Sequence, residues 1–231
     1  AVRQRAKKRK LKVLDATCPL VTKVHGEAQR YAQEEHTIIL IGHHSHVEVQ
    51  GTVGEAPERI IVVGSVEEVA ALKIEDEDKV GYITQTTLSM DDTAEIITAL
   101  KKRYPNIKGP AKDDICYATQ NRQNAVKALS KEVELVLVVG AQNSSNSVRL
   151  LEVAKTTGVK ARRIESAAEL KVEWLEGIRS IGITAGASAP EDIVQGIVAE
   201  LRKMSTSSQV RDLEIVREDV TFALPAVLRT A

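Results

Sequence analysis

Two cysteines occupy matching places in a sequence that repeats itself. Cys18 and Cys116 each follow a short apolar run, and a glycine lies equally far downstream in both copies, at Gly42 and Gly140. Free cysteines are often simply buried, but equivalent placement where two runs break into loops favours thiol chemistry or metal ligation. Thiolates prefer soft metals, and iron–sulfur clusters are held mainly by cysteine. Two cysteines are too few for a usual cluster, whereas a third repeat would bring a third thiolate.

A second group of reactive side chains lies in the segment 42–48, which reads GHHSHVE. It contains three histidines and one carboxylate, namely His43, His44, His46 and Glu48. Closely spaced histidines with a glutamate are plausible zinc ligands. The same loop is suited to an anion pocket in which imidazole N–H groups hold phosphate and Glu48 moves a proton. A solvent-exposed polar loop is the third interpretation.

Hydroxyl and amide donors cluster after other apolar runs. The segment 143–147 reads NSSNS directly before a predicted helix, Ser188 lies two residues before Pro190, and the segment 84–87 reads TQTT. Helix N-termini with Ser, Thr and Asn donors bind phosphate without lysine or arginine. Helix capping accounts for one serine in each loop but not for five consecutive polar residues. We therefore expect a pocket that fits a diphosphate.

The repeat that positions these groups alternates Val/Ile runs with helical patterns, which indicates βαβ crossovers and parallel sheets. Besides the cysteine and glycine landmarks, the segment 65–69 corresponds to 166–170, and 82–92 corresponds to 182–192. Strands are predicted at 13–16, 37–41, 59–63 and 81–84 in the first repeat, and at 114–116, 134–139, 161–164 and 180–184 in the second. Helices are predicted to follow Pro19, Glu48, Ser65, Ser89, Thr119, Ser145, Ser166 and Ala189. Ligand sites of parallel sheets lie at the carboxyl ends of the strands, so we expect the polar loops of both sheets to enclose one pocket.

The chain divides into four segments. The basic stretch at 1–12 is predicted to be the closing helix of a further unit that precedes the chain, because a helix also precedes the cysteine in the second repeat. Residues 13–112 and 113–204 form two α/β units. Residues 205–231 form a tail, with a linker at 205–209 followed by an extended segment that packs back.

Composition restricts the class of protein. Apolar residues make up 43% and aromatic residues only 3%, which is typical of parallel sheets with cores of Val, Ile, Leu and Ala. The net charge is zero, which gives no support to a nucleic-acid partner. The sequence contains neither a stretch long enough to span a membrane nor a signal-peptide pattern. We expect a soluble protein of the cytoplasm, or of the plastid stroma in a eukaryote.

Taken together, these motifs closely resemble the 4-hydroxy-3-methylbut-2-enyl diphosphate reductase family, which completes the methylerythritol phosphate route to isoprenoids. The motifs are the segments 15–25, 42–52, 84–89, 113–119, 143–147 and 184–190. The resemblance extends from the first residues to about Pro190 and more loosely to the C-terminus.

The resemblance implies an α/β protein of three units in pseudo-threefold arrangement, two of which are present here, around a 4Fe-4S cluster held by one cysteine from each unit. Cys18 and Cys116 match two cluster ligands. The residues that match the diphosphate pocket are His46, Ser144, Ser145, Asn146 and Ser188, with Thr87 as a further choice. Glu48 matches the carboxylate that delivers protons, and Thr86 the threonine that helps to orient it.

The reaction implied by the resemblance is reductive dehydroxylation of 4-hydroxy-3-methylbut-2-enyl diphosphate to isopentenyl and dimethylallyl diphosphate. Two electrons would pass through the cluster from a ferredoxin or flavodoxin type partner. The sequence departs from the family in lacking the first unit with its cysteine, so we expect the 231-residue chain by itself to be inactive.

Two alternatives come from other classes of protein. One is a zinc-dependent hydrolase that uses His44, His46 and Glu48. The other is a non-enzymatic diphosphate-binding module that never holds a cluster. Neither accounts for the paired cysteines as well as the reductase does.

Overall fold

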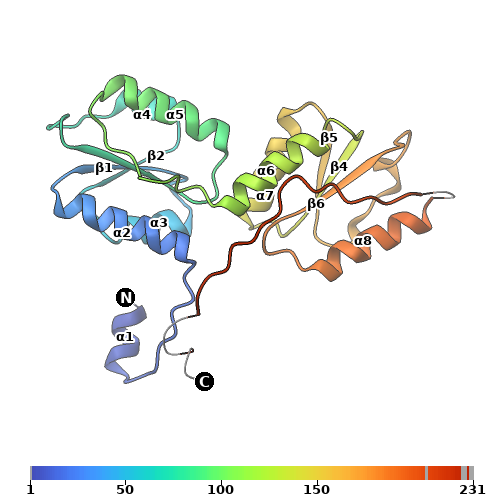
Figure 1. Cartoon of the computed structure of the whole chain (residues 1–231), viewed down its shortest axis with the longest axis horizontal. Helices are drawn as coiled ribbons and strands as arrows, with labels where there is room; N and C mark the ends of the chain where they lie inside the picture. Colours follow the sequence, from blue (N-terminus) through green and yellow to red (C-terminus); the bar gives the residue numbers. More distant parts are fainter. Residues whose placement is uncertain (1, 206–207, 225–227, 229–231) are drawn as a thin grey trace.

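The computed structural model, which describes residues 2–205, 208–224 and 228, contains two small parallel sheets of three strands each. The first sheet comprises β1 (Thr37–Ile41), β2 (Ile60–Val63) and β3 (Val80–Thr84), in the order β2-β1-β3. The second comprises β4 (Leu135–Val139), β5 (Lys160–Ile164) and β6 (Ile181–Ala185), in the order β5-β4-β6. Figure 1 shows the sheets in two lobes, which we call the first and the second unit. The matching strand order confirms the predicted α/β fold of repeated parallel-sheet units.

Helices cover both faces of each sheet. In the first unit they are α2 (Pro19–Gln33), α3 (Val47–Val53), α4 (Val66–Ala71) and α5 (Met90–Arg103). In the second unit they are α6 (Tyr117–Leu129), α7 (Ser145–Thr156) and α8 (Glu191–Lys203), with short 3-10 helices η1 (Ala167–Glu169) and η2 (Val172–Trp174). Serine side chains accept a hydrogen bond from a backbone N–H in the first turn of α4, α5 and α7, which satisfies donors that have no partner within the helix.

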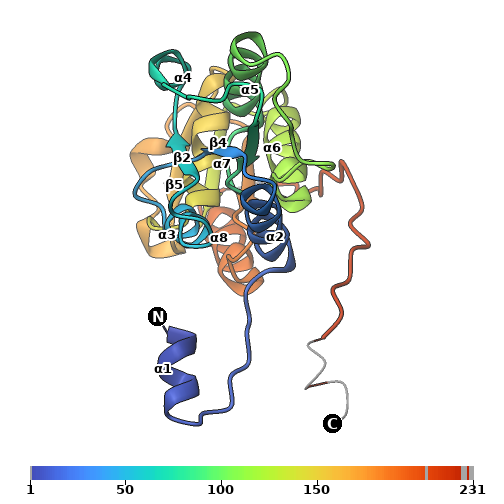
Figure 2. The same ribbon diagram turned by 90° about the vertical axis from the view of Figure 1, so that its left-hand side faces the viewer.

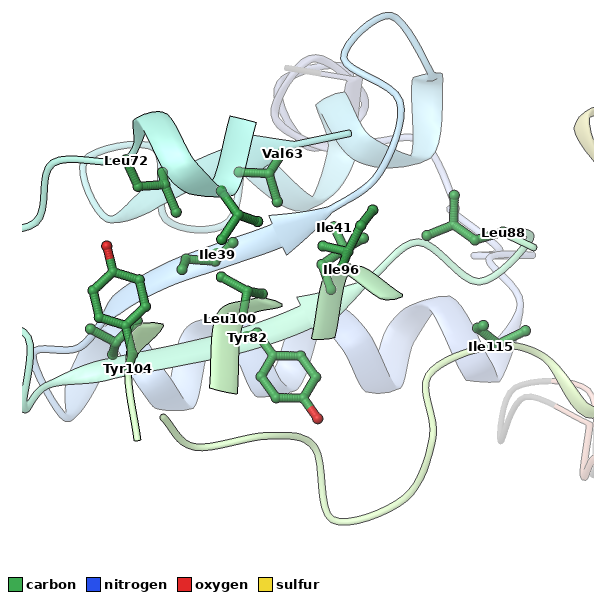
Figure 3. Close-up of a cluster of buried hydrophobic side chains, with 12 residues drawn as sticks. Ile39, Ile41, Val63, Leu72, Tyr82, Leu88, Ile96, Leu100, Tyr104 and Ile115 are labelled. Carbon is green, nitrogen blue, oxygen red and sulfur yellow. The ribbon is translucent and has the colours of Figure 1, made fainter. Parts of the chain in front are cut away.

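The alternating side chains of β1 show why a fully apolar strand forms here. Ile39 and Ile41 pack against Leu72, Ile96 and other residues from α4, α5 and their neighbouring loops (Figure 3). Ile38 and Leu40 point to the opposite face and pack with residues of α2 and α3. Successive side chains of a strand face opposite sides, so a central strand covered on both faces must be apolar throughout.

The second unit is built in the same way around β4. Val136 and Val138 pack against α6 and α7, whereas Leu137 and Val139 belong to the cluster that includes Ile197 of α8. All five residues of β4 are buried. The two central strands therefore hold the loops that follow them on rigid supports.

Two predicted strands are wrong. Residues 13–16 and 114–116 are extended or irregular, and neither pairs with a strand in the described part of the chain. Val13 and Leu14 are exposed, so their apolar character reflects no burial within this structure. Asp114 is held by its side chain instead of by a strand ladder. Each unit consequently has three strands, not four.

The other predicted elements agree with the structure to within a few residues. The strand predicted at 37–41 has these bounds, and the remaining five differ by one residue at one or both ends. The helix predicted after Thr119 begins at Tyr117, and the one predicted after Glu48 begins at Val47. After Ser166 the chain forms only η1, a single 3-10 turn, in place of an α-helix.

The ends of the described chain lie apart from the sheets. Figures 1 and 2 show α1 (Val2–Lys8) standing away from both units at the end of the segment 9–18. The segment 208–224 is extended, as predicted, and Glu218 accepts a hydrogen bond from Asn121 of α6. Residues 206–207 of the predicted linker, and 225–227 and 229–231 of the predicted tail, lie outside the described residues. No helix in the described ranges is long and apolar enough to cross a membrane.

Candidate functional site

The polar loops of the two units meet at the carboxyl ends of the strands. Thr87, which follows β3, forms a 3.0 Å hydrogen bond between hydroxyl groups with Ser145, which follows β4. The loop after β1 contacts the second unit as well, since His43 Nε2 lies 2.9 Å from Arg149 Nη2 of α7. Loops that follow parallel strands are the usual place for a ligand site, and here both sheets contribute to one junction.

The two cysteines have matching local geometry. Cys18 is the N-cap of α2 with φ −54° and ψ 133°, and Cys116 is the N-cap of α6 with φ −55° and ψ 131°. Both are free thiols; Cys18 is exposed and Cys116 is partly exposed. The positive end of a helix dipole favours negative charge at each position. Loss of hydration, followed by Glu218, Cys116 and Cys18, raises the pKa of Tyr117, the residue that follows Cys116.

An ion pair connects the elements that carry these cysteines. Lys23 of α2 binds Asp114 Oδ1 at 2.9 Å through its Nζ and also donates to the Lys112 carbonyl at 2.6 Å. The other oxygen of Asp114 accepts from the backbone N–H of Thr84 at 2.9 Å. The side chain of Asp114 has no exposed area. One buried carboxylate thus fastens the Cys116 loop to the helix that begins at Cys18 and to the end of β3.

Glu48 is fixed from two sides by Thr86. The Thr86 N–H donates to Oε1 at 2.7 Å and its hydroxyl donates to Oε2 at 3.0 Å. The carbonyl of Thr86 accepts from the Cys116 N–H at 2.9 Å. The carboxylate is therefore joined to Cys116 through a single intervening residue. Hydrogen bonds to an ionised carboxylate are stronger than those between neutral groups.

His46 is oriented by its position as the N-cap of α3. Its Nδ1 accepts from the Glu48 N–H at 3.2 Å, which leaves the proton on Nε2 as a donor directed away from the helix. His44 is turned elsewhere and binds Glu68 at 3.0 Å. His43 contacts Arg149, and the family resemblance assigned no role to it.

The serine loop before α7 is organised around Ser144. Its Oγ accepts from the Ser147 N–H at 3.3 Å and from the Ser147 hydroxyl at 3.0 Å, which leaves its own proton free for a ligand. Asn146 is 8% exposed, and its amide nitrogen and oxygen have no hydrogen-bond partner in the described residues. Buried amides without partners are rare in folded proteins, so this one indicates a ligand. Ser188 follows β6 in the neighbouring loop and is exposed.

Several residues that organise this site were missed from the sequence. Gln85 is 1% exposed and links two loops, because its Oε1 accepts from the His43 N–H and its Nε2 donates to Thr87. Its place inside the TQTT motif could have identified it. Lys23 and Arg149 carry no local signal, since their partners come from other parts of the chain. Ser147 binds the nearby Ser144 and lies within the 143–147 motif, which could have identified it.

The donor set favours an iron–sulfur cluster over zinc. Two thiolates at helix N-termini near one tyrosine suit iron–sulfur ligation, and they are the only cysteines in the chain. The zinc alternative required His44, His46 and Glu48 to converge. In the described part of the chain no group of three or more His, Cys, Asp or Glu side chains has the arrangement of a metal site, and His44 binds Glu68 instead.

Comparisons with known proteins agree on one family. Residues 1–202 match the family model described as LytB protein. A 4-hydroxy-3-methylbut-2-enyl diphosphate reductase of Azoarcus sp. is 52% identical over 100% of this chain and 74% of its own length. One from Pseudomonas aeruginosa is 51% identical over 99% of this chain and 74% of its own length.

Solved structures lead to the same group. The E-1-hydroxy-2-methyl-but-2-enyl-4-diphosphate reductase of Plasmodium falciparum superposes with a TM-score of 0.92 at 38% identity, covering 97% of this chain and 71% of that one. An (E)-4-hydroxy-3-methyl-but-2-enyl diphosphate reductase described as the terminal enzyme of the non-mevalonate pathway has a TM-score of 0.56 at 34% identity. It covers 87% of this chain and 72% of that one.

Proposed function

The chain belongs to the LytB protein family of 4-hydroxy-3-methylbut-2-enyl diphosphate reductases, and we propose that the groups at the junction of its two units carry out the reaction of that family. The protein is an oxidoreductase of isoprenoid biosynthesis through the methylerythritol phosphate pathway. The zinc hydrolase and the non-enzymatic binding module are not favoured, since the curated relatives are reductases.

The reaction replaces a hydroxyl group by hydrogen. The C–O bond breaks, water leaves, a C–H bond forms, and the balance requires two electrons and two protons. The product is isopentenyl or dimethylallyl diphosphate, according to the carbon that receives the proton. When bound, an iron–sulfur cluster supplies the electrons for this step.

Cys18 and Cys116 are the proposed protein ligands of a 4Fe-4S cluster. Their matched N-cap geometry, each at the positive end of a helix dipole, supports this assignment. The ion pair between Lys23 and Asp114 maintains the relation between the two helices that carry them.

The diphosphate is proposed to bind across the junction. On one side the donors are His46 and Thr87, and on the other they are Ser144, Ser145, Asn146 and Ser188. The first turn of α7 adds backbone N–H groups and the positive end of its dipole, which together favour a phosphate. The unpartnered amide of Asn146 supports this assignment.

Glu48 is the proposed proton donor, and Thr86 orients it. The observation that carries the proposal is the sequence of contacts from Glu48 through Thr86 to Cys116. These contacts connect Glu48, which would donate a proton to the leaving hydroxyl group, to Cys116, which would bind the cluster that supplies the electrons. A positioned carboxyl group at a leaving oxygen accelerates a reaction by about a hundredfold or more.

Partners and location follow from the same chemistry. The substrate is a small diphosphate, and the electrons require a reducing partner of the ferredoxin or flavodoxin type. We also propose that the protein acts in the cytoplasm, since the curated relatives reported above are bacterial.

Anaerobic reconstitution with iron and sulfide tests the assignment of the ligands. The unmodified chain is expected to bind both elements and to show visible thiolate-to-iron absorption, whereas Cys18→Ser and Cys116→Ser each lose most of it. Glu48→Gln is expected to retain the absorption and, in the full-length protein, to lower turnover by about a hundredfold or more. Unchanged iron and sulfide binding in both cysteine variants would contradict the proposal.

A further inference from the structure

Arg149 joins the two units through its guanidinium group. It lies on α7 of the second unit, and its side chain is 14% exposed. Nη2 donates to Nε2 of His43 at 2.9 Å, and Nη1 lies 3.2 Å from Asp92 Oδ2; both partners belong to the first unit. Nη1 is also 2.7 Å from Glu152 on the same helix. A planar guanidinium with fixed donors suits such a contact better than a lysine would.

This contact closes a ring of hydrogen bonds across the junction. The His43 N–H donates to Gln85 Oε1 at 3.1 Å, and Gln85 Nε2 donates to Thr87 Oγ1 at 3.0 Å. Thr87 pairs with Ser145 at 3.0 Å, and α7 then leads from Ser145 to Arg149, which returns to His43. Cooperative networks of this kind hold a geometry better than separate contacts do.

Residues of the ring are close in sequence to the polar groups assigned above to the diphosphate. His46 lies three residues after His43 and caps α3, while Ser144 and Asn146 flank Ser145 at the start of α7. His43 is thus bound to α7 through Arg149, and Ser145 is bound to the loop after β3 through Thr87.

We propose that Arg149 is a positioning residue, which binds His43 across the junction and thereby holds the start of α3, with His46 and Glu48, near the first turn of α7. The two units then present their donors to one diphosphate at a set separation. The inference rests on the proposed function for the identity of the ligand but not for the contact itself. It assigns a role to His43, which the sequence motifs left without one.

The contact requires a neutral imidazole. His43 Nε2 accepts from Arg149, so its proton lies on Nδ1, and protonation of Nε2 would place two cations face to face. Asp92 and Glu152 favour the charged imidazole, whereas Arg149 and His46 oppose it. Loss of hydration, with Arg149 next, lowers the pKa of His43 below its ordinary value of 6.5. The contact is therefore present at neutral pH and is lost as the pH falls through the lowered pKa.

Four variants test this role. Arg149→Met and His43→Ala remove the contact, His43→Gln keeps an acceptor that does not titrate, and His44→Ala changes a neighbouring histidine that binds Glu68 instead. Small-angle X-ray scattering reports the separation of the units without any ligand. Isothermal titration calorimetry with inorganic diphosphate measures the affinity of the pocket for that ligand.

Arg149→Met and His43→Ala are each expected to enlarge the radius of gyration and to weaken diphosphate binding about tenfold, and the double variant is expected to be no worse than either single one. His43→Gln is expected to retain most of the affinity, and His44→Ala all of it. At pH values below 6.5, the ratio of the wild-type affinity to the His43→Gln affinity is expected to decrease. Because both proteins bind the same diphosphate, protonation of the ligand affects them equally and does not change the ratio.

Additive losses, or an Arg149→Met protein with wild-type scattering, would overturn the positioning role. If the wild-type chain bound no diphosphate, the proposed ligand would be wrong, while the scattering comparison would still decide whether Arg149 holds the units together.

Discussion

Thr86 binds both oxygens of Glu48, with its backbone N–H on Oε1 and its hydroxyl on Oε2. One residue thus fixes the plane of the carboxyl group, and its own carbonyl is held by the N–H of Cys116. The backbone contact is available to every residue except proline, whereas the hydroxyl contact depends on the side chain. The two contributions can therefore be separated by mutation.

Replacing the hydroxyl at this position is expected to lower turnover without unfolding the protein. Thr86→Val keeps the shape and removes one of the two donors to Glu48, so we expect the rate of the loaded full-length protein to fall by roughly tenfold to a hundredfold. Thr86→Ser is expected to restore most of the rate. Anaerobic kinetics with a chemical reductant measure both.

Thr84 offers a matched control for this variant. It is also buried, lies at the end of β3 two residues before Thr86, and its hydroxyl donates to the carbonyl of Gln85. Thr84→Val is expected to leave turnover close to that of the wild type. An equal loss in the two valine variants would show that the orientation of Glu48 is not the cause.

The ion pair between Lys23 and Asp114 is expected to stabilise the arrangement of the cysteines. Asp114→Asn removes the charge that binds Lys23, and we expect the free energy of unfolding to fall by roughly 1 to 3 kcal/mol because a buried partner is lost. Absorption of a cadmium complex with the two thiolates is expected to weaken as well. Denaturant unfolding and cadmium titration provide the measurements.

The neighbouring carboxylate serves as the control for that change. Asp113 is exposed, and Asp113→Asn is expected to alter neither stability nor cadmium binding. Equal behaviour of the two asparagine variants would contradict a specific role for Asp114.

Ser147 lies between two glycines, and its position makes a rescue experiment possible. A Cβ atom added at Gly186 would come within 2.2 Å of Ser147 Oγ but 3.4 Å from its Cβ, which is an ordinary contact. Gly186→Ala is therefore expected to displace Ser147, disturb Ser144 and weaken binding of inorganic diphosphate, as measured by calorimetry. Gly186→Ala is also expected to lower the melting temperature, and adding Ser147→Ala is expected to remove the clash and to restore that temperature.

The corresponding change at Gly140 has a different expected outcome. There the added Cβ would lie 2.7 Å from Ser147 Cβ, so Ser147→Ala leaves a clash and no rescue is expected. Gly196→Ala on α8 meets nothing within 4 Å and is expected to raise the melting temperature slightly. Rescue at both clashing glycines, or at neither, would argue against this packing.

Glu27 is expected to make stability depend on pH. Loss of hydration, followed by Asp114, raises the pKa of this buried carboxyl from 4.5 to about 7, against the opposing effect of Lys23 and Arg30. The folded protein then holds the proton more tightly than the unfolded chain does. Its contribution is fully present below pH 4.5 and is lost as the pH rises through about 7.

Glu27→Gln is expected to flatten this dependence. At pH 8 the variant is expected to be more stable than the wild type by roughly 1 to 3 kcal/mol, and at pH 5 the difference should be small. Urea unfolding at the two pH values measures it, with the exposed Glu58→Gln as the control. A wild type whose stability does not change between pH 5 and pH 8 would refute the assignment.

Predictions from the sequence were accurate where a structural feature depends on neighbouring residues and wrong where it depends on residues far along the chain. The strand at 37–41 was predicted with its observed bounds because an uninterrupted apolar run needs only cover from helices on both faces. Residues 13–16, which read VLDA, are mostly apolar but have no paired neighbour in the described chain, and a pattern within four residues carries no information about pairing. The short segment before Cys116 failed for the same reason, since Asp114 is held by distant groups.

The sequence by itself determined the repeat, the residue types at the end of each strand and the chemistry those types permit, because these are properties of neighbours along the chain. Tertiary structure alone decided that Arg149 contacts His43, that Lys23 contacts Asp114, and that Ser147 fits between Gly140 and Gly186. Those contacts join segments that are far apart in the sequence. They exist only because parallel strands bring the loops that follow them to one edge of each sheet.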